Sequence, residues 1–205
     1  MIPTLLLATR NLKKQKELQD LAAGLDWRIL TLRDFPGCPE IIEDGNTFLQ
    51  NATKKAVEIS RHTGQLTLAD DSGLEVEALG NAPGVYSARY ARGEGSTDEE
   101  NLRRVLMELG DTPEVRRAAR FVCAAVIARG GEVCFSTVRS VEGRITSAPR
   151  GTNGFGYDPI FYYPPFGQTF AEIDTARKHS VSHRGQAMKA VIEFLTGNGQ
   201  QILDS

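Results

Sequence analysis

The chain has 205 residues, of which 40% are hydrophobic and 24% are charged. This size predicts one sizeable domain, or two lobes around a shared cleft, and we treat residues 1–205 as a single domain. The net charge of −2 and the pI of about 6.0 give no basic footprint, so we expect no nucleic-acid partner.

The targeting and redox signals favour a reducing cytoplasm. A short apolar run near the N-terminus precedes its charges, which is the reverse of a signal peptide. No segment approaches the roughly 20 apolar residues of a membrane span, so no membrane partner is expected. The three cysteines form no C-x-x-C pair, which argues against a structural zinc site.

Strand and helix patterns alternate over the first 80 residues. The apolar runs predict strands at 4–9, 27–32, 66–70 and 74–79. Helices are predicted from 11 to 23, stopping at Gly24, and from 46 or 47 to 61, ending at Gly64. Such alternation is typical of parallel strand pairing in an α/β fold.

The second half of the chain predicts antiparallel pairing as well. After a long loop, Ser96 or Thr97 begins a helix that runs to Leu109, with Glu99 or Glu100 completing a capping box. The apolar region 117–145 predicts two strands joined at Gly130–Gly131, and a last helix follows from Ser182. Together the two halves predict a mixed sheet.

A strand that turns into a helix at residues 8–18 is a candidate anion site, because backbone N–H groups and the helix dipole point toward it. Thr9 and Asn11 provide polar side chains, and Lys14 lies about one turn into the helix. The alternative is an ordinary capped helix with solvated lysines.

Acidic residues follow the strand predicted at 66–70. Asp70 and Asp71 precede Ser72 and Gly73, which places two carboxylates at the carboxyl end of that strand, where open α/β folds build their sites. Glu43 precedes a predicted helix and offers a further carboxylate. Carboxylate oxygens suit Mg²⁺, and a carboxylate can accept a proton from water. The alternatives are a polar turn at the aspartates and a helix-start charge at Glu43.

A glycine-rich loop and a basic segment complete the candidate site. The loop 151–159 carries Phe155 and Tyr157, either of which could stack on a planar base, although a simple loop is as well supported. Lys178, His183 and Arg184 are donors suited to phosphate or to a carbonyl oxygen. His183 alone would more often cap or pack. The combined inventory suits a nucleoside triphosphate with Mg²⁺.

Five segments of the chain resemble motifs of the Ham1/RdgB family of inosine/xanthosine triphosphate pyrophosphatases. They are "TRNLKKQKEL", "EDGNTFLQNA", "ADDSGLEVEALGNAPGVYSARY", "GTNGFGYDPIF" and "SHRGQA", which occur in the family's order over nearly the whole chain. The resemblance implies an elongated mixed sheet with flanking helices, two lobes around a central nucleotide cleft, and a homodimer. It also implies Mg²⁺-dependent hydrolysis of ITP, dITP and XTP to the monophosphate and pyrophosphate.

The resemblance assigns roles by motif position. Asp71 is the implied proton acceptor, and Glu43 and Asp71 are the implied metal ligands, although the sequence leaves open whether Asp70 or Asp71 acts as the base. The implied substrate-binding residues are Thr9, Arg10, Asn11, Leu12, Lys13, Lys14 and Ser72, with Phe155, Gly156, Tyr157, Asp158, Lys178, His183 and Arg184 at the base.

Arg10 departs from the family pattern, which has a small residue there, so it could add a phosphate contact or point outward. The alternatives to this function are a pyrophosphatase for other modified nucleotides and a nucleotide-binding module without turnover.

Overall fold

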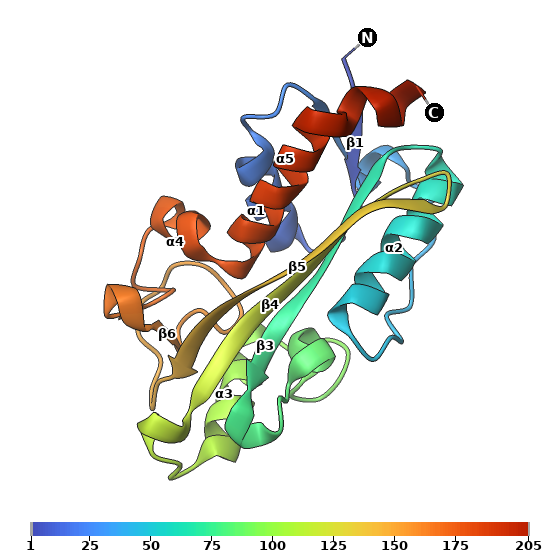
Figure 1. Cartoon of the computed structure of the whole chain (residues 1–205). Coiled ribbons are helices and arrows are strands. Elements are labelled where there is room, and N and C mark those ends of the chain that lie inside the picture. The colour runs from blue at the N-terminus through green and yellow to red at the C-terminus, as the bar shows by residue number, and fades with distance from the viewer. Residues whose placement is uncertain (1, 205) are drawn as a thin grey trace. The chain divides into compact units, whose positions relative to one another are not determined.

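The computed structural model describes residues 2–204, and for residues 198–204 it describes the helical backbone alone. The strands are β1 Thr4–Leu7, β2 Arg28–Thr31, β3 Thr67–Val76, β4 Ala118–Arg129, β5 Glu132–Ile145, β6 Phe161–Tyr163 and β7 Gln168–Thr169 (Figure 1). The α-helices are α1 Leu12–Ala22, α2 Phe48–Thr63, α3 Asp98–Leu109, α4 Thr175–Val181 and α5 His183–Asp204. Within the described residues, no helix is both long and apolar enough to cross a membrane.

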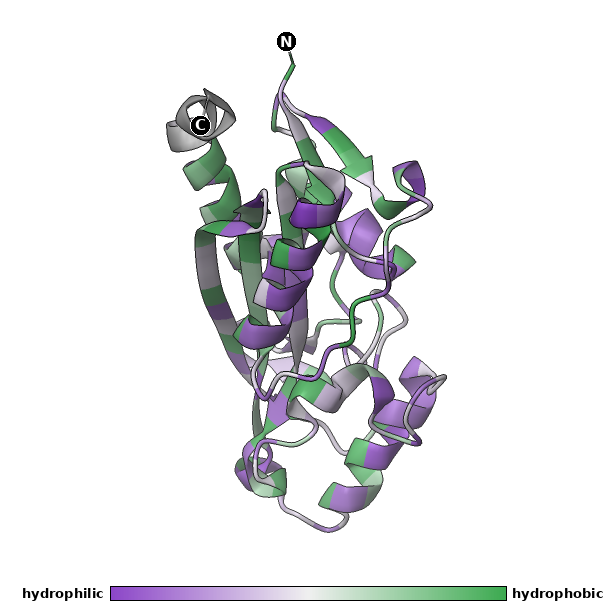
Figure 2. Cartoon of the chain, turned by 90° about the vertical axis from the view of Figure 1, so that its right-hand side faces the viewer, coloured by the Kyte–Doolittle hydropathy of each residue, from purple (hydrophilic) through white to green (hydrophobic). Residues whose placement is uncertain are grey.

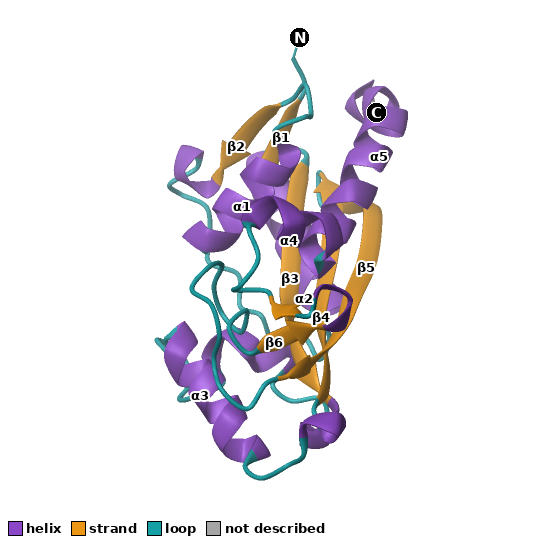
Figure 3. Ribbon diagram, turned by 90° about the vertical axis from the view of Figure 1, so that its left-hand side faces the viewer, coloured by secondary structure: helices purple, strands orange, loops and turns teal. Residues whose placement is uncertain are grey.

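The strands form one seven-stranded mixed sheet in the order β2-β1-β3-β4-β5-β6-β7. β1 pairs in parallel with β2 and with β3, and Figure 3 shows β1 and β2 side by side. β6 pairs antiparallel with β5 and with β7. Gly130 and Gly131, both at positive φ, join β4 to β5 by a tight turn of the kind that only antiparallel neighbours allow. The predicted mixed α/β sheet is therefore confirmed.

The chain folds into two compact units, which we call unit 1 and unit 2. Unit 1 comprises Met1–Asp71, Cys123–Arg139 and Gly185–Ser205, and unit 2 comprises Ser72–Val122 and Ser140–Arg184. Whether residues 1–205 behave as a single domain stays a prediction.

Unit 1 has helices on both faces of its strands. Leu18 of α1 and Val191 of α5 share one buried apolar cluster with Leu5 and Leu68 of the strands. α2 covers the other face and buries Phe48, among others, while its hydrophilic side is turned to the viewer in Figure 2. The amphipathic stripe that predicts α2 therefore has its apolar face on the sheet.

Unit 2 has an aromatic core of its own. The rings of Phe121 and Phe161 lie 4.5 Å apart between centroids, and those of Phe161 and Phe170 lie 5.0 Å apart. Leu74 of β3 and Val105 of α3 belong to the same buried cluster. This packing fixes the elements that carry the glycine-rich loop 151–159.

The helix ends follow the sequence signals closely. Asn11 caps α1, Thr47 caps α2, and Thr97 with Glu100 forms the capping box of α3. Gly64 ends α2 in the left-handed conformation. α4, β6 and β7 were not predicted, because elements of two to seven residues carry little periodic signal.

The predicted strand end at Asp70–Asp71 is wrong. β3 continues through both aspartates, Ser72 and Gly73 to Val76, so the carboxylates lie in mid-strand. Gly73 is not a turn residue: a Cβ there would lie 2.2 Å from the Ser87 hydroxyl oxygen, which accepts from the Leu74 amide at 2.9 Å. The glycine permits close packing inside a strand. The strand predicted at 74–79 is therefore the end of β3 followed by a 3₁₀ turn, Glu77–Leu79.

Candidate functional site

The predicted phosphate turn lies between β1 and α1 in unit 1. The Asn11 side-chain oxygen accepts from the backbone amides of Lys13 at 3.0 Å and Lys14 at 3.2 Å. The Thr9 hydroxyl accepts from the Asn11 amide at 3.2 Å. Because Asn11 already uses two amides at the helix start, we expect the lysine side chains to supply most of the attraction for an anion.

Arg10 turns toward the connection that follows β2. Its guanidinium donates to the Cys38 carbonyl oxygen at 2.8 Å. Together with Thr9, Leu12, Gln15, Leu32, Arg33 and Pro36 it lines a cavity of about 380 Å³. Arg10, the residue that departs from the family pattern, thus has a hydrogen-bond partner within unit 1.

Asp70 and Asp71 are both buried, at 2% and 5% exposure, and their partners come from different helices. Lys14 of α1 lies 3.5 Å from the Asp70 carboxylate, whereas the Asn51 amide of α2 donates to the Asp71 carboxylate at 3.0 Å. α1 and α2 cover opposite faces of the strands, and successive strand residues point to opposite faces. The doubled aspartate therefore divides between two faces.

Lys55 of α2 links the remaining acidic groups of unit 1. Its ammonium donates to the Glu43 carboxylate at 2.6 Å and to the Asp70 backbone carbonyl at 2.7 Å. We call Glu43, Asn51, Lys55 and Asp71 the acidic cluster. Its members come from the loop before α2, from α2 itself and from the middle of β3.

Burial raises the pKa of the Asp71 carboxyl above its usual range, and the nearby charge of Glu43 acts in the same direction. The ammonium groups of Lys14 and Lys55 and the hydrogen bond from Asn51 act against that rise without cancelling it. A raised pKa makes a carboxylate a better proton acceptor near neutral pH.

The carboxylate oxygens of Glu43 and Asp71 in the acidic cluster suit a hard cation such as Mg²⁺. Glu43 is close enough to Asp71 for its charge to raise the pKa of the Asp71 carboxyl. Among the described residues, no group of three histidine, cysteine or acidic side chains gathers as a ready-made metal site. A Mg²⁺ ion held by these two carboxylates would thus need further oxygens from substrate or water.

Asn51 and Lys55 are the functional candidates that sequence reasoning missed. Both lie on the face of α2 that also carries Phe48, Ala52 and Ile59. A polar residue on a buried face needs a polar partner, so an amide and a lysine within this apolar stripe were the available signal.

In unit 2, the glycine-rich loop is held by the buried carboxylate of Asp158. This carboxylate accepts from the Phe155 amide at 2.9 Å and from the Lys178 ammonium at 2.7 Å. Gly154, at φ +72°, has to be glycine, because a Cβ there would lie 2.0 Å from the same carboxylate oxygen. Asp158 thus shapes the loop.

Tyr157 anchors the same loop on its other side. Its hydroxyl donates to the Ser87 carbonyl at 2.8 Å, and burial raises the pKa of Tyr157 well above its usual value. The Tyr157 phenol therefore stays protonated near neutral pH and remains a hydrogen-bond donor.

The Phe155 ring faces two cations. The Lys178 nitrogen lies 5.1 Å and the Arg184 guanidinium carbon 5.7 Å from its centroid. Arg184 also donates to the Ser72 hydroxyl at 2.7 Å. His183, at the start of α5, stacks on Phe121 with centroids 4.7 Å apart, so it has a packing role.

The predicted site residues thus form two groups. Unit 1 holds the phosphate and metal candidates, which are Thr9, Arg10, Asn11, Leu12, Lys13, Lys14, Glu43 and Asp71. Unit 2 holds the substrate contact Ser72 and the base candidates, which are Phe155, Gly156, Tyr157, Asp158, Lys178, His183 and Arg184.

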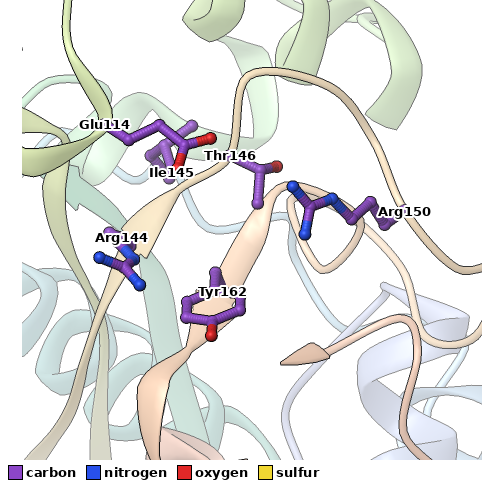
Figure 4. A pocket seen from close by; sticks show the side chains of 6 residues that line it. All are labelled: Glu114, Arg144, Ile145, Thr146, Arg150 and Tyr162. Carbon is purple, nitrogen blue, oxygen red and sulfur yellow. The ribbon is translucent and has the colours of Figure 1, made fainter. Parts of the chain in front are cut away.

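Unit 2 has a further cavity that none of these residues lines. It has a volume of about 130 Å³. Its walls are Glu114, Arg144, Ile145, Thr146, Arg150 and Tyr162, and Figure 4 shows the two arginine side chains entering from different segments. Arg144 lies over the Tyr162 ring at 4.7 Å, which gives that guanidinium an intramolecular partner.

Several known proteins are similar to this chain over nearly their whole length. The dITP/XTP pyrophosphatase of Desulforamulus reducens is 48% identical over 93% of this chain and 94% of its own. That of Shouchella clausii is 46% identical over 94% and 96%. The structure of a HAM1 protein from Coxiella burnetii matches with a TM-score of 0.85 and 40% identity, covering 96% of this chain and 100% of its own.

The model of the Ham1 family matches residues 5–194, which include every predicted site residue. The match therefore covers both the acidic cluster of unit 1 and the glycine-rich loop of unit 2. With relatives at this identity and coverage, the chain belongs to the Ham1 family.

Proposed function

We propose that this protein hydrolyses the purine nucleoside triphosphates ITP, dITP and XTP to the monophosphate and pyrophosphate. The observation that carries the proposal is the buried Asp71, with Glu43 and Lys55 in the same acidic cluster, in a chain 48% identical to a dITP/XTP pyrophosphatase. Such a cluster provides a proton acceptor, carboxylates for a cation, and a cation for phosphate.

Asp71 is the proposed proton acceptor. It takes a proton from the water that attacks the triphosphate, the bond between the α- and β-phosphoryl groups breaks, and pyrophosphate leaves. Asn51 supports the role, because its amide holds one carboxylate oxygen at 3.0 Å and so fixes the orientation of the other. Asp70 is the weaker candidate for the base, since its carboxylate is 3.5 Å from Lys14 on the other face of the strands.

Glu43 and Asp71 are the proposed ligands of Mg²⁺. When bound, the ion would offset the negative charge of the triphosphate and polarise its phosphoryl oxygens. Lys14, Lys13 and Lys55 are the proposed cations that stabilise the charge developing on the leaving pyrophosphate. No nucleophilic side chain is needed, because phosphoryl transfer depends mainly on positioning and charge.

Base recognition is assigned to unit 2. Phe155 offers an aromatic face, and Lys178 and Arg184, which flank it, are donors. Hypoxanthine and xanthine carry an acceptor oxygen at position 6, where adenine carries an amino donor. Such donors favour the oxygen and leave adenine poorly paired, and a site built on a required hydrogen bond can discriminate by about 10⁴.

The test is pyrophosphate release from ITP, XTP and ATP, with Mg²⁺ present and after its removal by EDTA. We expect release from ITP and XTP to require Mg²⁺ and to exceed release from ATP by at least about 100-fold in kcat/KM. Equal rates with ATP would contradict the base assignment. Faster turnover of dUTP would indicate a pyrophosphatase for other nucleotides, and binding without release would indicate a binding module.

The homodimer and the cytoplasmic location belong to the same proposal. Light scattering on the purified protein is expected to give twice the mass of the 22.4 kDa chain. A mass of one chain at micromolar concentration would contradict the dimer.

A further inference from the structure

The glycine-rich loop of unit 2 has a second carboxylate contact, from a residue distant in sequence. The backbone amide of Gly156 donates to the Asp98 carboxylate at 3.0 Å. The preceding amide, that of Phe155, donates to Asp158 at 2.9 Å. Consecutive amides of this loop are therefore held by two different aspartates.

Asp98 is the first residue of α3, and its neighbours make different contacts. Glu100 closes the capping box with Thr97, and the exposed Glu99 pairs with Arg103 at 2.5 Å. Three acidic residues thus share one helical turn, and Asp98 contacts the loop. A bond from an amide to a carboxylate is shorter and stronger than one to a neutral acceptor.

The two contacts bracket the aromatic residue of the loop. Phe155 lies between Gly154 and Gly156, both at positive φ, so its backbone has little local resistance to rotation. Holding the Phe155 and Gly156 amides fixes the two peptide planes that meet at the Phe155 Cα, and with them the direction in which its side chain leaves the backbone. That ring faces Lys178 and Arg184.

We propose that Asp98 is a positioning residue for base recognition, which acts by holding the Gly156 amide and thereby the Phe155 ring. This inference rests on the proposed function, because it assigns Asp98 to the selectivity of the same site. Asp98 takes no part in the bond-breaking step, so its loss should affect substrate binding and selectivity more than turnover.

The experiment compares Asp98→Ala with Glu99→Ala. Both changes remove one carboxylate from the first turn of α3, so both lose the same interaction with the helix dipole. For Asp98→Ala we expect KM for ITP to rise about tenfold, kcat to change less than threefold, and the preference for ITP over ATP to fall. Glu99→Ala should match the wild-type protein in KM, in kcat and in the preference for ITP over ATP. Asp98→Asn keeps an acceptor oxygen and should restore KM to within about threefold.

Hydrogen exchange at the Gly156 amide provides a readout independent of activity. Its protection should fall in Asp98→Ala and persist in Glu99→Ala and Asp98→Asn. If Asp98→Ala does not fold, Asp98→Glu keeps the helix charge but displaces the acceptor, and should show the same rise in KM.

A KM and an ITP preference in Asp98→Ala equal to those of Glu99→Ala would overturn the inference, as would unchanged protection of the Gly156 amide. If the unchanged protein releases no pyrophosphate from ITP, the proposed function itself fails. The two failures are therefore distinguishable.

Discussion

Each unit places a lysine beside a buried aspartate, and the two pairs differ in closeness and exposure. In unit 2, Lys178 and Asp158 are 2.7 Å apart, and their side chains are 5% and 3% exposed. In unit 1, Lys14 and Asp70 are 3.5 Å apart, and the lysine side chain is 16% exposed. The same two residue types thus form a short, buried pair in unit 2 and a longer, more exposed pair in unit 1.

The comparison separates two uses of buried charge. Asp158 also accepts from the Phe155 amide, so the pair in unit 2 maintains the shape of a loop. The lysines of unit 1 lie near carboxylates that we assign to a cation and to a proton acceptor. Burial of the Lys178–Asp158 pair fixes the local backbone structure. The greater exposure of Lys14 leaves more of its ammonium accessible to an anionic ligand.

The largest expected effect is on the chemistry of unit 1. Asp71→Asn should lower kcat for ITP by about 10³-fold, because the amide cannot accept the proton from water. The fold should persist, since the amide is nearly the same size. The matched control is Asp26→Asn at an exposed site of the same unit, which should keep full turnover. Turnover within tenfold of the unchanged protein would remove Asp71 from the mechanism.

The next effect tests the two lysine–aspartate pairs directly. Lys178→Met leaves the Asp158 charge buried without its ammonium and should cost about 3–5 kcal/mol of unfolding free energy. Lys14→Met should cost about 1 kcal/mol, because its pair is longer and partly solvated. Urea denaturation of both variants measures the difference. Equal losses of unfolding free energy would show that the two pairs contribute equally to stability.

Close packing in unit 2 is expected to make Gly73 sensitive to a single methyl group. Gly73→Ala places a Cβ 2.2 Å from the Ser87 oxygen and 2.7 Å from the Gly84 carbonyl oxygen, and should cost about 1–3 kcal/mol. Gly24→Ala in unit 1 is the control, because no atom lies within 4 Å of its added Cβ. Its unfolding free energy should change by less than about 1 kcal/mol. Similar melting curves for the two variants would contradict the close contact.

The smallest effect concerns a tyrosine of unit 2. Burial, followed by the hydrogen bond to Glu108, raises the pKa of Tyr90 from 10.0 to about 12. A raised pKa in the folded state means that folding favours the protonated phenol. Its contribution is therefore complete below pH 10 and is lost as the pH rises through 12.

Tyr90→Phe should consequently cost about 1 kcal/mol at pH 8, where the donor to Glu108 is removed, and less above pH 11. Denaturation of both proteins across that range measures the difference. A gap that stays constant with pH would contradict the assignment.

Local signals settled the helix limits and the tight turn. Asn11 was readable as a helix start and Gly64 as a helix end, because a cap is satisfied by residues within four positions of it. The other two starts were narrowed to Asn46 or Thr47 and to Ser96 or Thr97, of which the structure selects Thr47 and Thr97. Gly130–Gly131 was readable as a hairpin for the same reason. Glu43 and Asp71 of the acidic cluster and the residues of the glycine-rich loop were also identified as candidates, because their chemical types can be read directly from the sequence.

Only the tertiary structure decided how those residues are used. It placed Asp70 and Asp71 inside β3 on opposite faces, brought Lys55 to Glu43 and to the Asp70 carbonyl, and joined Asp98 to Gly156. These contacts link positions 12 to 58 residues apart. They depend on strand register and on which helix covers which face, and no short window of sequence contains that information.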